Sequence, residues 1–463
     1  MIEPALVSLV LFLILICFSN WRIGFFVTIL FGFLQDPLRK LMPGEPVFMV
    51  VFIGLFIFAT IAGAKSNNIP LTFQSILREN PSLINALTIF IFFVFIQAII
   101  TILKLNSVIL AGIGLMAYLT PWVIIPIAYQ YAYKKGSIET FFHFYLLVSL
   151  CITSGIYLSF FGIEWRIFEQ VGSGIHAFAP TGEKLVLHCG FMRAPEVAAW
   201  HAGASACITI MLFVSQRKKG LYSWISGLIT VFFIVAIILT GRRKMLMEVA
   251  LFTAFFGWSL FYFRKEASRL AFFILICGIT FTALANYFFS TYEFSSEIMP
   301  YYRRGMSVGE DAPGRLNLMT IKTFRWIIHQ NGFFGSGAGT GSQGARFFGG
   351  GTSLVGLAAE GGLGKVLAEL GIPGLLLILW LAGNLFNHLW TLMRRARSSG
   401  QAFILYGMIS FLISNAIVFM TAHQIFGDLF VLFILGSILG FILATSKLVL
   451  DDNRKQKALS SLI

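Results

Sequence analysis

The stretch LINALTIFIFFVFIQAIITIL at residues 83–103 decides the fold, because it runs for 21 positions without a charged side chain. A helix of about 20 apolar residues crosses the hydrocarbon core of a bilayer. Similar runs recur along the chain, which is 57% hydrophobic and only 12% charged, whereas soluble domains carry about 25% charged residues. The sequence therefore predicts an all-α polytopic membrane protein.

The apolar runs predict about 12–14 transmembrane helices. We expect spans at 4–18, 22–36, 47–64, 83–103, 107–131, 138–161, 196–215, 221–240, 245–263, 270–289, 372–390, 402–420 and 429–446. The predicted organisation is helices over 1–289 with a loop at 162–195, a large loop over 290–371, three helices over 372–446 and a tail over 447–463. Because long loops in compact proteins are usually functional or disordered, and the large loop is rich in aromatic residues, we expect the active site there.

Basic residues predict the orientation of these spans. When the spans alternate, one side receives 18 of the 34 basic residues but only 5 of the 20 acidic ones. An excess of lysine and arginine marks the cytoplasmic side, so the tail is expected in the cytoplasm and both long loops outside. This topology explains the net charge of +14 without a nucleic-acid partner.

The segment Leu239-Thr-Gly-Arg-Arg-Lys244 departs from this charge rule, since it places three cations in a short outer loop. Arg242, Arg243 and Lys244 are therefore candidates for binding an anionic group at the outer membrane interface. Contact with lipid headgroups or with a helix end is the alternative.

The large loop combines arginines with aromatic residues, among them Arg303, Arg304, Arg315, Arg325 and Trp326. Guanidinium groups bind diphosphates and aromatic faces stack on sugar rings, although an interfacial belt with ordinary surface charge would have the same composition.

Glycines follow at 335–344, where Gly339-x-Gly341-x-x-Gly344 has the spacing of a dinucleotide fingerprint. No strand precedes these glycines, so we expect a flexible backbone close to a bulky substrate instead.

The sequence predicts no metal and no cofactor. His176, His188 and Cys189 share the first outer loop, but their spacing matches no metal-ligand pattern, and the five cysteines include no CxxC pair. Glu196 and Glu248 lie near the outer ends of spans, where we expect them to pair with the outer arginines.

Three stretches of this sequence resemble the O-antigen ligase and O-antigen polymerase superfamily of bacterial surface-polysaccharide enzymes. They are the Leu-Thr-Gly-x-Arg motif at 239–243, the segment GRLNLMTIKTFRWIIHQNGFFGSGAGTG beginning at Gly314, and AAEGGLGKVLAELGIPGLL at 358–376. A shorter echo, GFMRAPEVAA at 190–199, makes Arg193 a further candidate. In the ligases a histidine lies about nine residues before the acidic residue of the ELG turn, whereas Glu360 holds that place here, nine before Glu369. This difference favours a polymerase-type member.

The resemblance implies a GT-C-like glycosyltransferase whose donor is a polyprenyl-diphosphate-linked oligosaccharide. It implies Arg243 and Arg315 as catalytic residues that stabilise the leaving diphosphate, with Glu360 as the candidate base. Arg242, Arg193, Lys244, Arg325 and Trp326 are expected to bind substrate. The implied location is the bacterial inner membrane with a periplasmic site, among membrane lipids, and a chain-length regulator or flippase of the same pathway is a possible partner.

Two alternatives stay open. The first is a ligase that moves a finished glycan onto a lipid or protein acceptor. The second is a transporter or flippase of lipid-linked sugars, a class that tends to have internal repeats, broken helices and ionisable residues at mid-membrane. Glu369, just before a span, is expected to be a helix-end residue.

Overall fold

The computed structural model describes residues 2–77, 80–172, 177–178, 182, 184–216, 220–264, 299–306, 323–342, 344–345, 361–397 and 399–460. Ten of its helices are long and apolar enough to cross a membrane, which confirms a helical multi-pass membrane protein. They are α3 (Met49–Ser66), α5 (Pro81–Leu105), α6 (Val108–Ala132), α7 (Ser137–Phe160), α8 (Pro195–Gln216), α9 (Leu221–Leu239), α10 (Arg243–Phe263), α16 (Gly362–Arg395), α17 (Ala402–Thr421) and the part Leu429–Val449 of α18 (Leu429–Ser460).

The remaining expected spans have mixed outcomes. Two of them form helices, α1 (Ile2–Ser19) and α2 (Trp21–Leu41), and the expected span at 270–289 lies outside the described residues. The shorter elements are α4 (Phe73–Ile76), η1 (Arg166–Phe168), α12 (Met299–Met306), α14 (Thr323–Asn331) and η5 (Gln424–Gly427). One small departure from an all-α fold is an antiparallel pair, β1 (Ala177–Phe178) with β2 (Lys184–Leu185), within the loop at 162–195.

The chain forms two compact units, and each is assembled from separate parts of the sequence. The first unit contains Met1–Pro70, Tyr131–Gly309 and Ser399–Ser414, and the second contains Leu71–Gln130, Glu310–Ser398 and Asn415–Ile463.

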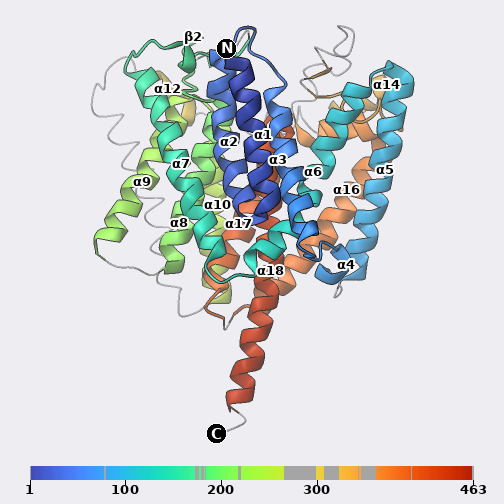
Figure 1. Cartoon of the computed structure of the whole chain (residues 1–463), viewed down its shortest axis with the longest axis vertical. Helices are drawn as coiled ribbons and strands as arrows, with labels where there is room; N and C mark the ends of the chain where they lie inside the picture. The colour runs from blue at the N-terminus through green and yellow to red at the C-terminus, as the bar shows by residue number, and fades with distance from the viewer. Residues whose placement is uncertain are drawn as a thin grey trace. The chain divides into compact units, whose positions relative to one another are not determined.

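In the first unit, helix α8 packs against α7, α9 and α10 (Figure 1). Its sequence AAWHAGASA at 198–206 is rich in small residues, and every residue of this segment is buried. Small side chains let neighbouring helices approach closely. In a bilayer this close packing drives helix association, because lipid tails are as apolar as the helix surfaces and the hydrophobic effect adds little. Helix α8 is therefore closely packed among its neighbours in the first unit.

The second unit is built on close contacts between α5 and α16 and between α6 and α18. Gly436 and Gly440 lie one turn apart on α18, and a Cβ atom on Gly440 would lie only 2.6 Å from the Cβ of Ala128 on α6. Helix α16 is broken at Gly371, whose φ of 68° and ψ of −168° are not helical. The break separates a short N-terminal segment of α16 from the apolar span that follows it.

Candidate functional site

The turn between α9 and α10 is formed by Thr240 and Gly241. Thr240 is fully buried, donates its hydroxyl to the carbonyl of Ile237 (2.6 Å) and accepts the N–H of Arg242 (3.3 Å). Gly241 has a φ of 66°, and a Cβ atom there would lie 2.6 Å from Cδ2 of Leu187. The Leu-Thr-Gly sequence therefore folds into a tight turn that presents Arg242 and Arg243 at the start of α10.

Arg242 is held by an ion pair with Glu196 in the first turn of α8. The Nη2–Oε1 distance is 2.8 Å, and the two side chains are only 16% and 17% exposed. Burial lowers the pKa of the Arg242 guanidinium, and the charge of Glu196 opposes this shift. This contact confirms the expected pairing of Glu196 with an arginine of the 242–244 segment, and Glu248 is fully buried within α10.

Helix α12 brings a further arginine, Arg304, to the same turn. Arg304 donates from Nε to the carbonyl of Gly241 (3.1 Å), and the hydroxyl of Tyr301 bonds to the carbonyl of Val186. Tyr301 also joins a small apolar cluster with Leu185 and Leu187. This residue therefore fastens α12 to the loop after β2.

His188 connects that loop to two helices. Its Nδ1 atom lies 3.0 Å from Oγ of Ser159 on α7, and its Nε2 atom lies 3.3 Å from the hydroxyl of Tyr301 on α12. Burial lowers the pKa of His188, so the neutral imidazole is the form that this position favours.

We define the basic cluster as Arg242, Arg243, Lys244, Arg303 and Arg304. It comprises the start of α10 and the last turn of α12, two elements that pack against each other. Arg242 has an acidic partner in Glu196, and Arg303 is exposed. Five cations on two adjoining elements, together with the N-terminus of α10, form an arrangement suited to an anion with several oxygens.

Arg193 is part of the anchor that holds the loop 162–195 on α2. Its backbone N–H donates to Oδ2 of Asp36 (3.0 Å), its Nη1 lies 3.4 Å from Oδ1, and its carbonyl accepts the N–H of Val171 (2.9 Å). These contacts give Arg193 an anchoring role three residues before Glu196. Its proposed contact with substrate stays a prediction.

Lys40 completes the anchor from the same helix. Its ammonium is fully buried and donates to the carbonyls of Ile167 (2.9 Å), Gly190 (2.9 Å) and Met192 (2.6 Å). Burial lowers the pKa of Lys40, an effect that nearby Cys189 opposes. Hydrogen bonds to three carbonyls offset much of the cost of burying this charge.

Arg325 and Trp326 lie in the second unit, on the exposed face of α14. The opposite face of α14 packs on the N-terminal segment of α16 through Ile327, Leu367 and Ala368. Trp326 is 41% exposed. Among the described residues, nothing encloses this pair in a pocket, and their role as substrate ligands stays a prediction.

The glycine-rich turn packs against protein rather than lying open for a substrate. A Cβ atom on Gly337 would lie 2.3 Å from Oγ1 of Thr101, and one on Gly339 would lie 2.1 Å from the carbonyl oxygen of Leu110. Thr101 also donates its hydroxyl to the carbonyl of Ala338 (2.8 Å). The expectation of a flexible substrate-facing backbone was therefore wrong at these two glycines, because close contact with α5 and α6 requires them.

Glu369 lies at the end of a helical segment, as expected, but its side chain is not exposed there. It is fully buried two residues before the break at Gly371, accepts the hydroxyl of Tyr118 (2.6 Å) and accepts the N–H of Gly341 (2.8 Å). Its carboxylate thereby joins α6, the glycine-rich turn and α16. Sequence position alone did not distinguish this buried role from helix capping.

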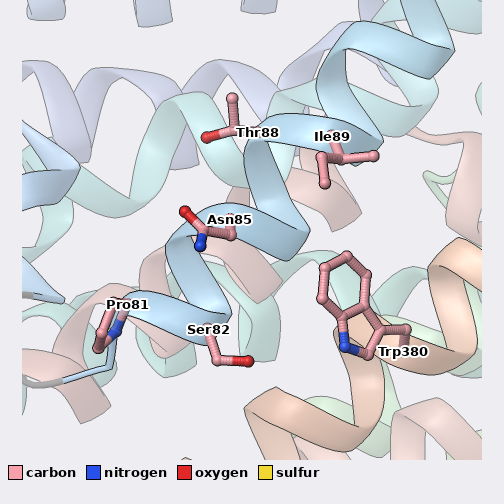
Figure 2. A pocket seen from close by; sticks show the side chains of 6 residues that line it. All are labelled: Pro81, Ser82, Asn85, Thr88, Ile89 and Trp380. Atoms are coloured by element: carbon pink, nitrogen blue, oxygen red, sulfur yellow. The ribbon is translucent and has the colours of Figure 1, made fainter.

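A groove of about 530 Å³ lies between α5 and α16 (Figure 2). It is lined by Pro81, Ser82, Asn85, Thr88, Ile89 and Trp380. Ser82 donates its hydroxyl to Oδ1 of Asn384 (2.6 Å) across the two helices. No charged side chain lines this groove, so it does not suit a diphosphate.

Arg315 and Glu360 lie outside the described residues, as does His176. The structure thus brings Arg242, Arg243 and Lys244 together with α12, and it places Arg193 on a separate anchor. Searches of protein-family models, of curated proteins and of solved structures found nothing that matches this chain. The functional argument therefore rests on the chemistry of the site.

The sequence reasoning missed Asp36, Lys40 and Tyr118. Each is a single polar residue in or beside an apolar run, and nothing in the sequence shows which distant segment it contacts. The sequence did offer one indication for Asp36 and Lys40. A charged residue within or close to a membrane span is costly unless it is paired, so both residues could have been expected to have a partner.

Proposed function

We propose that this chain is a membrane glycosyltransferase that polymerises polyprenyl-diphosphate-linked oligosaccharide repeat units into a surface polysaccharide. The observation that carries the proposal is the basic cluster, in which α10 and α12 pack together with five cations and Arg304 bonds to the carbonyl of Gly241. In this proposal the protein lies in a bacterial inner membrane, the cluster faces the periplasm, and the helical fold is of the GT-C type.

The chemistry needs an anion site more than a metal. The hydroxyl oxygen of an acceptor sugar attacks the anomeric carbon of the donor, the bond from that carbon to the diphosphate oxygen breaks, and polyprenyl diphosphate leaves with at least two negative charges. The hydroxyl proton passes to a base. Positioned guanidinium groups stabilise the charge that develops on the leaving oxygen.

The cluster fits such a leaving group in two respects. The partly buried ion pair with Glu196 holds Arg242 in one geometry, so its charge is already oriented before a substrate binds. The cluster also begins a helix apolar enough to cross the membrane, which suits a donor with a charged head and a hydrocarbon tail. Arg243 is the residue to which the resemblance assigns the leaving group.

Glu360 is the proposed base and Arg315 a second proposed catalytic cation, both carried over from the resemblance. A glutamate serves as a base near neutral pH when partial burial raises its pKa. General-base assistance of this kind contributes about a hundredfold to ten-thousandfold in rate.

A transporter of lipid-linked sugars is the second candidate, because α16 is broken and carries a buried carboxylate near the break. In transporters, exposed backbone groups at such breaks bind the cargo. Here other backbone groups of the chain already bond to the groups at the break. The N–H of Gly337 donates to the carbonyl of Glu369 (3.0 Å), and the N–H of Ile372 donates to the carbonyl of Phe333 (2.9 Å). This occupancy favours the enzyme.

The test is to supply the purified protein, in nanodiscs and in proteoliposomes, with lipid-linked oligosaccharides from its host membrane. Growth of lipid-linked glycans to a ladder on a gel without any added acceptor supports the polymerase. Transfer only when a separate lipid or protein acceptor is present would indicate the ligase. Movement of unchanged substrate across the liposome bilayer would overturn the proposal in favour of the transporter.

A further inference from the structure

The groove between α5 and α16 has lipid as its surroundings. Both helices are long and apolar enough to cross a membrane, and they pack along each other within the second unit. The groove volume of about 530 Å³ lies within the range of about 300–1,000 Å³ that small-molecule sites occupy. Two of its lining side chains, Ile89 and Trp380, are 47% and 41% exposed. The groove is therefore open, and molecules of the bilayer are the ones that can enter it.

Polar side chains follow one another along the α5 side of the groove. Ser82, Asn85 and Thr88 recur every three residues, so they share one face of the helix, and all three are exposed (Figure 2). The hydroxyl of Ser82 donates to Oδ1 of Asn384 (2.6 Å). The hydroxyl of Thr88 donates to the carbonyl of Ile84 (2.9 Å). Because both protons are already placed, the two oxygens offer lone pairs to a ligand that brings O–H donors, and the Asn85 amide can both donate and accept.

The other end of the groove is apolar. Helices α5 and α16 run antiparallel, because the first turn of α5 meets Asn384 while its last turns meet the glycine-rich turn beside the break in α16. Ile89 and Trp380 line the groove, and one turn further along each helix Phe92 and Leu376 are 68% and 61% exposed. Hydrocarbon can therefore lie along the surface that continues from the groove.

The polar end is the one nearer to the membrane surface. Beyond Asn384, helix α16 becomes more polar with Asn387 and His388, and it ends with Arg394 and Arg395 in its last turn. Basic residues at the end of a span mark the membrane interface. A molecule in the groove thus meets polar groups near the interface and apolar groups deeper, which is the arrangement of a lipid.

The lining also defines the charge of that lipid. All 6 residues that line the groove are uncharged. An ionised headgroup gives up hydration when it enters such a groove and needs a charged partner in return, whereas a hydroxyl needs only a hydrogen bond. The lining therefore suits an uncharged headgroup that carries hydroxyl groups.

We propose that this groove binds one molecule of an uncharged lipid with a free hydroxyl group on its headgroup, the class to which the diacylglycerols belong. The headgroup hydroxyl bonds to Ser82, Asn85 or Thr88, and an acyl chain lies along Ile89 and Trp380. The inference does not rest on the proposed function, because it concerns a groove whose chemistry differs from that of the basic cluster.

The experiment places the full-length protein in phosphatidylcholine nanodiscs that contain a graded mole fraction of a diacylglycerol with a photoactivatable acyl chain. Mass spectrometry of peptides from α5 and α16 then measures saturable labelling. Unlabelled dioleoylglycerol should compete, and its 3-O-methyl ether, which lacks the hydroxyl, should compete about three- to tenfold less well, as expected for a hydrogen bond within a membrane. Dioleoylphosphatidic acid should compete no better than the ether.

Two threonines provide a matched pair of variants. Thr88 and Thr391 each donate to the carbonyl four residues earlier at 2.9 Å, but only Thr88 lines the groove. Thr88→Val should therefore raise the half-saturating mole fraction about three- to tenfold, whereas Thr391→Val should leave it unchanged. Asn85→Leu, which removes a donor and an acceptor together, should raise it at least tenfold.

Equal competition by dioleoylglycerol and its methyl ether would overturn the proposal, since the groove would then take any acyl chain. Stronger competition by phosphatidic acid would assign the groove to an anionic lipid and overturn it as well. Equal effects of Thr88→Val and Thr391→Val would show that the labelling does not depend on the groove. Labelling that is present in discs with one copy of the protein and lost in discs with two would assign the groove to a second copy of the chain.

Discussion

Replacing Lys40 by methionine should release the loop 162–195 from α2 while leaving the helices in place. The substitution keeps the bulk of the side chain but removes the ammonium that donates to the carbonyls of Ile167, Gly190 and Met192 at 2.6–2.9 Å. Each carbonyl that loses its donor while buried costs about 1–3 kcal/mol, and removing one partner of a buried charged contact typically costs about 3–5 kcal/mol. We therefore expect loop opening to become easier by about 3–5 kcal/mol.

Hydrogen exchange followed by mass spectrometry measures this opening directly. Because about 1.4 kcal/mol corresponds to a tenfold change in an equilibrium, amides of the loop should exchange roughly a hundredfold to several-thousandfold faster in Lys40→Met. The reporters are the N–H groups of Val171 and Met192, which are bonded within the loop. Peptides from α8 should keep their protection, and Lys104→Met, which loses one hydrogen bond of 3.3 Å, should change its own region less than tenfold. Unchanged loop protection in Lys40→Met would refute the reasoning.

Three further predictions concern the surroundings of the basic cluster. Burial lowers the pKa of His188, so the imidazole of the unfolded state takes up a proton first as the pH falls below about 6.5. The melting temperature of the wild type should therefore drop between about pH 7.5 and 5.5, and that of His188→Gln should drop much less. Equal drops in the two proteins would contradict this role. Glu196→Gln should lower the free energy of unfolding by about 1–3 kcal/mol, and the double-mutant cycle with Arg242→Gln should show a coupling energy of about 0.5–3 kcal/mol. If the effects of the two substitutions simply add, the ion pair contributes nothing to stability. Gly241→Ala should lower the stability by about 1–2 kcal/mol because of the left-handed φ, and by a further amount because the new Cβ would clash with Leu187. Adding Leu187→Ala to Gly241→Ala should recover only the part due to the clash, which melting curves of the single and double variants would test.

The spans could be predicted from the sequence because their signal is local. Runs such as 83–103 are apolar enough that no distant residue can change their interpretation, and the corresponding helix α5 extends over Pro81–Leu105. The asparagine before it, Asn80, caps the helix by accepting the N–H of Leu83 (3.2 Å), which accounts for the early start.

The candidate site could be predicted only in part. The three cations at 242–244 were visible as an exception to the charge rule, Glu196 was expected to pair with such an arginine from its place near a span end, and the ion pair confirms that pairing. The attachment of Arg304 to the carbonyl of Gly241 was not visible, because 63 residues separate them and only the fold brings them together.

Glycines were the least informative residues. Close packing on a helix and close approach to a ligand both require the absence of a side chain, so the sequence does not distinguish them. The contact of Gly339 with Leu110 shows that packing is the reason here.

The most direct test of the central claim is the rate of glycan transfer by Arg243→Ala relative to wild type, with lipid-linked oligosaccharide at saturation. A lost charge-stabilising donor at the leaving group costs about a hundredfold to a thousandfold in rate. Arg394→Ala is the matched control, since Arg394 lies in the last turn of α16 over the ring of Trp390 (5.5 Å) and should leave the rate within about twofold. A fall of at least a hundredfold in Arg243→Ala, with Arg243→Lys in between, is the predicted result. Wild-type turnover in folded Arg243→Ala protein would contradict the assignment of the diphosphate to the basic cluster.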